Sequence, residues 1–492
     1  MGTTNDKTME KPGDVIIDDI TLKSYNGFEM SLKGLFDNFI LYEDIFSNYM
    51  TGSITIVDSM NLVKNFPIIG AETLRISYFT PNYLDGAEDH KPVTLNFRTF
   101  KVSKYIETAQ ESALMVTIEF MSEQGIKSMQ TKVSKAYTNM SVADMIRSIY
   151  EEYLASDNTD YSDVYSAITS GAATGILSPV PGGTILGAAT AGLYAYRNRE
   201  EKIPLRTFTP TFDLRSYVIP YWSPLYAINW LCHRARSETD TRKCDFVFYE
   251  NSEGFHFTSL SDLKEMGKLP NRYHHYTNYP EGFRNKESER MLATEMRNVI
   301  FAKIQDFSDK AKQQALGMLA SSIYTHDLTT KKWTLDTFSY DDQFDSNMAL
   351  NKNPIMPRGK NNYSTAPYAH MKMYPNSSFT TKTGITVHDP NETVLKRQSL
   401  LNQMNSMNMV VEVWGDTTVK VGSVVKYTPV VKEFNKKIDK WEDDYLKGFY
   451  LITAIRHVIT DREHKMTMTL SRDSFAEPLA DQKKAQLQLG EQ

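Results

Sequence analysis

The residues best suited to bind a metal or to catalyse a reaction are scattered along this sequence. Cys232, His233 and Cys244 could supply three zinc ligands, but structural zinc sites pair cysteines about two to four residues apart, and these two are twelve apart. His274 and His275 are adjacent, and adjacent side chains on a strand point to opposite faces. The sequence therefore predicts no metal site and no metal cofactor.

Motifs for enzyme chemistry are missing as well. No phosphate-binding GxxxxGKS or GxxxxGKT loop occurs, and neither does a GxSxG nucleophile turn or an HExxH zinc motif. The acidic run with Asp341, Asp342 and Asp345 lacks the glycine and the glutamate of a calcium-binding EF-hand loop, so we interpret it as a solvated loop. The sequence predicts no catalytic residue and no bound cofactor, and we expect a protein that is not an enzyme.

The composition is typical of a globular protein with many strand-forming residues. The chain has 492 residues, which is enough for roughly three or four domains. Aromatic residues make up 12% of it, with 28 tyrosines, and this favours strands. The net charge of −5 and the lack of a lysine or arginine run argue against nucleic-acid recognition. Two cysteines and a polar N-terminus lead us to expect folding in a reducing cytoplasm.

The elements that must position any functional residue are mostly strands. Residues 15–120 contain runs of alternating polarity such as ALMVTIEF, in which Val116, Ile118 and Phe120 share one face. A helix is predicted from Ser141 to Leu154, with Ser141 as its N-cap. A second helix is expected from about residue 223, and a β-hairpin is expected to turn at 251–254. The predicted fold class is α+β and mostly β, with antiparallel barrel or sandwich domains, an α/β block and an inserted small-residue segment.

Two long regions are predicted to contain no strands. Residues 286–316 have a helical pattern, with Ser308 as a cap and Gly317 as a stop. Residues 341–390 are rich in Asp, Asn, Ser and Pro, and we interpret them as surface loops. Strands resume after them, and a polar tail follows from Ala476.

Two of the β regions have similar sequences. Gly70 begins GAETLRISYFTP and Gly422 begins GSVVKYTP, and in both cases a hairpin pattern follows about 30 residues later. We interpret this as two copies of one β fold in one chain. The predicted domains are a first β domain at 13–125, an α/β domain at 126–285 with an insertion at 155–199, a helical connector and second β domain at 286–475, and a tail at 476–492.

Several motifs together resemble a known family. They are VIPYWSPLYAINWLCHRA at 218–235, CDFVFYENSEGFHFTSL at 244–260, LYEDIFSNYMTGSITIVD in the first β domain and GFYLITAIRHVIT in the second. They resemble the baseplate hub proteins of contractile-tailed bacteriophages, whose fold also forms the N-terminal part of the type VI secretion spike protein VgrG. The resemblance covers about four fifths of the chain.

The resemblance implies a structural protein of the phage tail. Its two tail-tube-like β domains would form, in a homotrimer, a ring of six units that joins a sixfold tail tube to a threefold central spike. The implied partners are further copies of this chain, the spike, the tube or tube-initiator proteins, the tape measure protein and the baseplate wedge, with no recognition of nucleic-acid sequence. The implied location is the virion baseplate, after assembly in the host cytoplasm.

Eight residues match the motifs of this family position by position. The resemblance implies that they pack the core and shape turns, because proline fixes bends, tryptophan fills volume and glycine accepts positive φ. They are Pro220, Trp222, Pro224, Asn229 and Trp230 in the loop and helix, and Gly254, Phe255 and Phe257 in the hairpin.

The insertion at 155–199 departs from the family pattern. Residues 164–196 carry no charge, but prolines and glycines split them into arms of roughly 15 and 13 residues, each shorter than the ~30 Å core of a bilayer. We therefore do not expect a membrane span, and contact with a membrane stays an open alternative. A small-residue hairpin in the channel or at the host membrane is one hypothesis and a loose loop is the other. The hairpin would use Gly171, Gly175, Pro179, Pro181, Gly183 and Gly187.

Two other functions stay open at this point. A hub or spike component of a type VI-like injection machine shares the fold, but such proteins continue into a needle domain, and this sequence contains no β-helical repeats. A spike-associated cell-wall hydrolase is the alternative from another class, and it would need a catalytic acid and base that the motifs above do not supply.

Overall fold

The structure of this protein is a computed structural model. It describes residues 9–58, 66, 68–83, 91–107, 114–155, 205–279, 288–307, 309–327, 331, 333–356, 368–374, 390–435 and 440–478. The predicted small-residue hairpin lies outside the described residues, as does all of the insertion except Ala155. Within the described ranges, no helix combines the length and the hydropathy that a membrane crossing requires.

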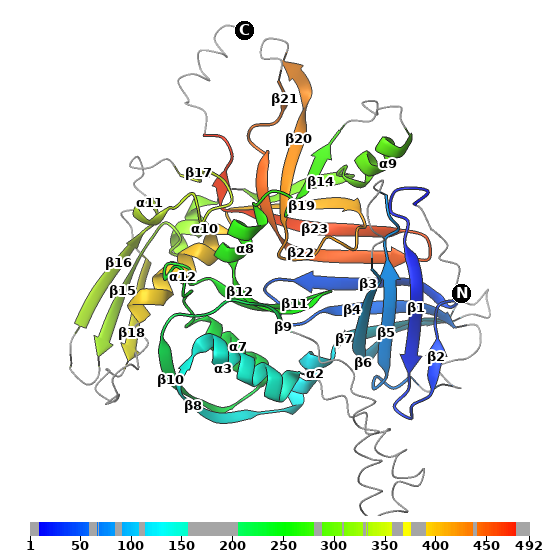
Figure 1. Cartoon of the computed structure of the whole chain (residues 1–492), viewed down its shortest axis with the longest axis horizontal. Helices are drawn as coiled ribbons and strands as arrows, with labels where there is room; N and C mark the ends of the chain where they lie inside the picture. Colours follow the sequence, from blue (N-terminus) through cyan, green and yellow to red (C-terminus); the bar gives the residue numbers. More distant parts are fainter. Residues whose placement is uncertain are drawn as a thin grey trace, which may run out of the picture.

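The N-terminal β unit is an antiparallel sheet with the strand order β3-β4-β7-β6-β5-β1-β2 (Figure 1, blue strands). Side chains on β4 and β7 alternate between a buried and a half-buried face, so Ile54, Val116 and Ile118 point into one core. The strands are β1 (Ile16–Lys23), β2 (Glu29–Ser31), β3 (Phe36–Asp44), β4 (Thr51–Asp58), β5 (Thr73–Phe79), β6 (Val93–Glu107) and β7 (Leu114–Ser122).

The C-terminal β unit pairs its strands in the order β14-β19-β23-β22-β20-β13. This order repeats β3-β4-β7-β6-β5-β1, except that β13 pairs in parallel with β20 whereas β1 pairs antiparallel with β5. The similar sequences fall on equivalent strands. Gly70 and Gly422, which precede β5 and β20, both have a positive φ, +85° and +86°. The strands are β13 (His274–Asn278), β14 (Phe301–Phe307), β19 (Met407–Trp414), β20 (Val424–Asn435), β22 (Gly448–Thr460) and β23 (His464–Arg472).

One long strand joins the two β units. The first part of β22 pairs with β20, and its last part, Ala454–Thr460, pairs antiparallel with Asp44–Asn38 of β3. Ile459 of β22 is buried in the core of the N-terminal unit. The two units therefore share one 14-stranded sheet, and we call the β3–β22 pairing the seam.

Most of the α/β block lies below this sheet around its own apolar core, and its last helix lies higher, beside the C-terminal β unit (Figure 1). The predicted helix after Ser141 is confirmed, because the Ser141 hydroxyl accepts a hydrogen bond from the Asp144 N–H at 3.1 Å. The elements are α2 (Glu123–Gln130), β8 (Val133–Ser141), α3 (Val142–Ile149), a π-helical turn η1 (Tyr150–Leu154), β9 (Leu205–Phe208), β10 (Leu214–Trp222), α7 (Pro224–Cys232), β11 (Phe246–Asn251), β12 (Gly254–Ser259) and α8 (Leu260–Gly267).

Two predictions for the middle of the chain were wrong. The region 286–316 is not all helical, because β14 lies between α9 (Ser288–Met296) and α10 (Lys310–Ala315). Pairing with β19 outweighs the local helical pattern there. The region 341–390 is not all loop, because β18 (Tyr368–Tyr374) pairs in parallel with β15 (Ala320–Asp327). Ser308 lies outside the described residues.

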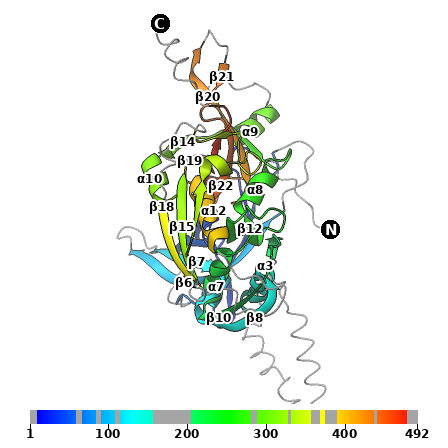
Figure 2. The same ribbon diagram turned by 90° about the vertical axis from the view of Figure 1, so that its left-hand side faces the viewer.

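A small separate sheet lies on one side of the molecule, where α12 packs against it (Figure 2). Its strand order is β16-β15-β18. The remaining elements are α11 (Tyr340–Gln343), α12 (Pro390–Gln403), β16 (Trp333–Ser339), β17 (Asn353–Pro354), β21 (Lys440–Glu442) and β24 (Ser474–Phe475). The predicted fold class, α+β and mostly β with antiparallel sheets, is confirmed, but the main sheet ends at β14 and β2 and is not a closed barrel.

Gly422 is the glycine whose substitution tests the packing between the C-terminal unit and the α/β block. A Cβ atom there would lie 2.4 Å from Tyr249 Oη, on a backbone with φ of +86°. We expect Gly422→Ala to lower the free energy of unfolding by roughly 1–3 kcal/mol in urea denaturation. Gly34→Ala is the matched control, because nothing lies within 4 Å of its added Cβ. Equal effects of the two substitutions would contradict the packing described here.

Candidate functional site at the junction of the β units

The seam contains a buried carboxylate that contacts all three parts of the molecule. Glu43 lies on β3, and its two oxygens accept hydrogen bonds from the backbone N–H of Ser252 at 3.1 Å and of Val421 at 3.2 Å. Ser252 belongs to the β11–β12 turn, and Val421 precedes β20. Burial raises the pKa of Glu43 to about 7, although the two N–H groups and Lys420 oppose the rise. Glu43 thus ties the N-terminal unit to the α/β block and to the C-terminal unit.

A second buried carboxylate ties the α/β block to the N-terminal unit. Glu250 on β11 accepts hydrogen bonds from the Met50 N–H at 2.9 Å and from the Ser122 hydroxyl. Burial raises its pKa to about 7, against the effect of these two donors. Asn48 and Asn229 add an exposed contact between the same parts, because each amide donates to the other, at 3.0 Å and 2.7 Å.

A buried ion pair connects α8 to the end of β23. The Lys264 ammonium and the Asp473 carboxylate lie 2.8 Å apart, with side chains 1% and 0% exposed. Asp473 also accepts hydrogen bonds from the Leu350 N–H at 3.0 Å and the Ser474 hydroxyl at 2.7 Å. Burial works to raise the pKa of Asp473, but Lys264 and these donors hold it below its usual value.

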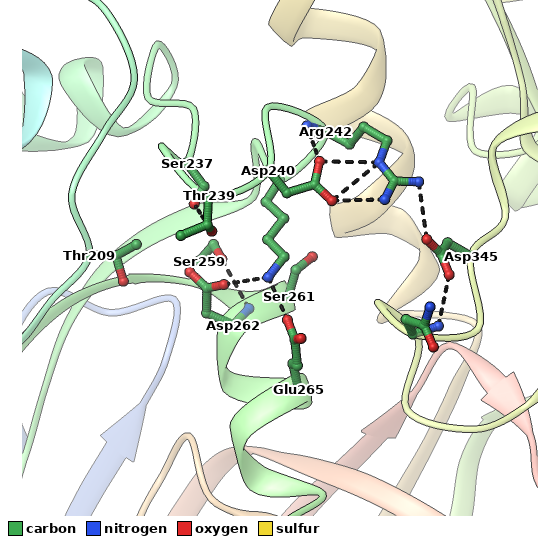
Figure 3. Close-up of polar contacts among 12 residues, drawn as sticks. Thr209, Ser237, Thr239, Asp240, Arg242, Ser259, Ser261, Asp262, Glu265 and Asp345 are labelled. Atoms are coloured by element: carbon green, nitrogen blue, oxygen red, sulfur yellow. Dashed lines mark hydrogen bonds and ion pairs between the residues drawn. The ribbon is translucent and has the colours of Figure 1, made fainter.

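Charged side chains on α8 and on segments near it are paired with one another (Figure 3). Arg242 bridges Asp240 at 2.8 Å and Asp345 at 3.0 Å. Lys243 lies between Asp262 at 2.7 Å and Glu265 at 2.5 Å. Each of these four carboxylates has a cation beside it, so the arrangement ties segments together rather than presenting an acid and a base to a substrate. Lys243 holds α8, and Arg242 joins Asp240 to Asp345. No group of three metal-ligating side chains occurs among the described residues.

The structure places the eight motif residues in the α/β block. Phe255 and Phe257 are buried in its core, Gly254 turns the β11–β12 hairpin with φ of +131°, and Pro224 is the first residue of α7. Trp222 and Trp230 are only half buried, and the centroids of their rings lie 5.3 Å apart. Pro220 is exposed on β10, and Asn229 is exposed on α7, where it contacts Asn48. Gly254, Phe255 and Phe257 belong to the β11–β12 hairpin, whose turn reaches Glu43.

Two edges of the main sheet expose apolar side chains and have no paired strand in the described residues. One is the outer edge of β14, where Ile300, Phe301 and Ile304 are exposed. The other is the side of β6 beyond Thr99, because β5 pairs only with the first part of β6, up to Arg98. Phe100 and the nearby Ile69 are exposed at that edge. Exposed apolar strand edges of this kind favour pairing with another chain.

The strands at these two edges correspond to the two strands that pair with each other in the seam. In the equivalent strand order, β14 corresponds to β3, and the later part of β6 corresponds to the part of β22 that pairs with β3. The seam therefore shows, inside one chain, how a β14 edge and a β6 edge could pair between two chains.

Sequence reasoning missed the residues that hold this junction together. Glu43 lies in LYEDIF and Glu250 in FVFYEN, where all six residues of the strand are buried. The available signal was a glutamate among the apolar residues of a strand. Such a glutamate indicates a buried carboxylate with hydrogen-bond partners, because a carboxylate is rarely buried without them. His457 of the seam and His464 of β23 carried no comparable signal.

Comparison with known proteins gives matches among solved structures. No protein-family model matches the sequence, and no curated protein matches it. The tail protein from Neisseria meningitidis is 7% identical, with a TM-score of 0.47 over 93% of this chain and 98% of that chain. The 43 kDa tail protein of prophage MuSo2 from Shewanella oneidensis is 9% identical, with a TM-score of 0.44 over 92% and 98%. A chain of the Francisella PdpA–VgrG complex is 8% identical, with a TM-score of 0.42 over 97% and 60%. These structures come from the groups of proteins that the sequence resembles.

Proposed function

We propose that this protein is a structural hub of a contractile phage-tail baseplate, and that three copies form a ring of six β units between the tail tube and the central spike. The observation that supports the proposal is the repeated strand order of the two units together with their seam. Because the seam joins two equivalent β units within one chain, the same kind of contact can also join a unit of one copy to a unit of the next. Such head-to-tail contacts close into a ring when the rotation permits.

The contact between copies would be made by the two open edges. The β14 edge of one copy would add to the β6 edge of the next, as β3 adds to β22 within the chain. The pairing would cover Phe301 and Ile304, which are 55% and 43% exposed. Three copies would then have six seams, three within chains and three between them, and no open edge of either kind. In this ring the spike and the tube would occupy opposite ends.

Engineered disulfides test the contact directly. In the seam, Ile40 of β3 faces Val458 of β22, and the equivalent positions are Lys303 on β14 and Ile106 on β6. Facing residues in antiparallel strands have Cβ atoms about 4.5–5.5 Å apart, close enough for a disulfide after a small shift. We expect the full-length variant with Lys303→Cys and Ile106→Cys to form covalent dimers and closed trimers under mild oxidation.

The matched control pairs Lys303→Cys with Glu29→Cys. Glu29 is exposed on β2, at the far end of the sheet, where no contact between copies is proposed. Monomers in both variants, or equal cross-linking in both, would contradict the proposed ring contact. The native cysteines, Cys232 and Cys244, are buried and do not compete.

A further inference from the structure

Both β units carry a β-bulge at the same place in the sheet. The register of β22 on β23 shifts at Thr453, and the first register shift of β6 on β7 falls at Phe100. The residues just before the two glycines of positive φ are equivalent as well, and they are Val421 and Ile69. Thr453 and Val421 of the C-terminal unit therefore correspond to Phe100 and Ile69 of the N-terminal unit.

The equivalent positions differ in exposure. Thr453 and Val421 are buried, with 5% and 1% of their surface exposed, whereas Phe100 and Ile69 are 41% and 63% exposed. Phe100 and Ile69 lie close together, because a Cβ added to Gly70 would be 3.1 Å from the carbonyl group of Phe100. We call the surface formed by Ile69 and Phe100 the bulge surface. It is the more apolar of the two positions, and it is the one that this chain leaves open to water.

In the C-terminal unit, the cover comes from the segment that continues β3 beyond the seam. Ile45 directly follows β3, and its backbone N–H donates a hydrogen bond to the carbonyl of Thr453 at 2.9 Å. The side chain of Ile45 is buried in one cluster with Val421 and with Tyr249 of β11. The strand that forms the seam thus leads straight into residues that cover the bulge of the unit with which it pairs.

The helix α10 continues β14 in the same way as Ile45 continues β3. The strand β14, which corresponds to β3, ends at Phe307, and α10 begins at Lys310. Gln313 of α10 is buried, whereas Ala311 and Ala315, on the opposite side of the helix, are exposed. Leu316, which ends the helix, is exposed too. The outer side of α10 therefore presents apolar side chains directly after the strand edge that would pair with β6.

We propose that α10 of one copy packs on the bulge surface, Ile69 and Phe100, of the next copy. The inference rests on the proposed ring, in which β14 of one copy pairs with β6 of the next, and it adds a side-chain contact to that strand pairing. The occupant is a second copy of this chain, because the covering segment continues from the paired strand, as Ile45 does in the seam. Burial of the two large side chains would then help to hold the copies together.

Photo-cross-linking on the full-length chain tests this contact. Phe100 is replaced by the photoreactive analogue p-benzoylphenylalanine in the variant with Lys303→Cys and Ile106→Cys, whose disulfides hold the ring closed. Isotope-labelled and unlabelled copies are mixed, so that mass spectrometry shows whether an attachment joins two copies. We expect attachment to residues 309–316 of a second copy. Phe28, which is 71% exposed between β1 and β2, is the matched control, and the same analogue there should attach to no second copy.

The outcomes separate this inference from the proposed function. The disulfide-linked ring can form while Phe100 attaches only within its own copy, or to a part of the next copy outside α10. Either result would overturn the α10 contact and leave the ring in place. If no covalent ring forms, the ring contact is wrong and the inference falls with it.

A substitution measures how much the bulge surface contributes to assembly. Phe100→Thr introduces the side chain that the C-terminal unit carries at the equivalent bulge, Thr453, and the exposed position of Phe100 spares the core. We expect the association of copies without engineered disulfides, followed by native mass measurement over a range of concentrations, to weaken at least about tenfold. Phe28→Thr should leave association unchanged. Equal association of Phe100→Thr and the wild-type chain would overturn the proposal.

Discussion

Replacement of Lys264 by methionine is expected to lower the free energy of unfolding by about 3–5 kcal/mol, the largest single effect that the structure predicts. The substitution leaves the Asp473 carboxylate in a site that is 0% exposed, without the ammonium 2.8 Å away. The hydrogen bonds from Leu350 and Ser474 remain, but they do not neutralise its charge. Urea denaturation followed by the fluorescence of Trp222 and Trp230, which pack on the same α/β block, measures the loss.

Lys420→Met is the matched control for this prediction. It removes the same side chain from an ion pair with Glu253, whose side chain is 51% exposed. Water and salt screen such a pair, so we expect a loss below about 1 kcal/mol. A loss of the same size in both variants would show that the buried Lys264–Asp473 pair has no special role in joining α8 to β23.

Replacement of Glu250 by glutamine is expected to change how stability depends on pH. Burial raises the pKa of Glu250 to about 7, so the folded chain holds a proton that the unfolded chain releases above pH 4.5. Its contribution to stability is fully present below pH 4.5 and is lost as the pH rises through 7. Between pH 5 and 8 the wild-type chain should therefore lose about 2–3 kcal/mol that Glu250→Gln does not lose.

Urea denaturation at a series of pH values checks this prediction, through the difference between the unfolding free energies of the wild-type chain and of Glu250→Gln at each pH. The buried histidines contribute with the opposite sign, because the lowered pKa of each makes the folded state weaker in acid. Their contribution is common to both chains and cancels when the two profiles are subtracted. Glu253→Gln is the control: burial works to raise the pKa of Glu253 but Lys420 holds it low, so this variant should follow the wild-type profile between pH 5 and 8. Parallel wild-type and Glu250→Gln profiles would contradict the buried, protonated state of Glu250.

Local signals in the sequence predicted the local structure well. The cap at Ser141, the helix after Ser223 and the hairpin turn between Asn251 and Gly254 each depend on residues close together in the chain, and each is present. The similar sequences after Gly70 and Gly422 predicted two β units, and the two strand orders agree with them.

Long-range pairing could not be predicted in the same way. The seam joins Leu41 to His457, and nothing in either strand distinguishes this pairing from pairing with any other strand of similar polarity. The strand β14 was mistaken for helix because its partner, β19, lies about 100 residues further along the chain. The role of Glu43 depends on the seam, so it emerges only once the strands are placed.

Native mass measurement of the full-length chain over a range of concentrations tests the central claim most directly. That claim is that two equivalent β units in one chain, joined by the seam, let three copies form a ring of six units. The account predicts a closed species of three times 56.3 kDa, with no further growth at higher concentration. A chain that stays at 56.3 kDa at every concentration, or that forms only dimers or open-ended polymers, would contradict it.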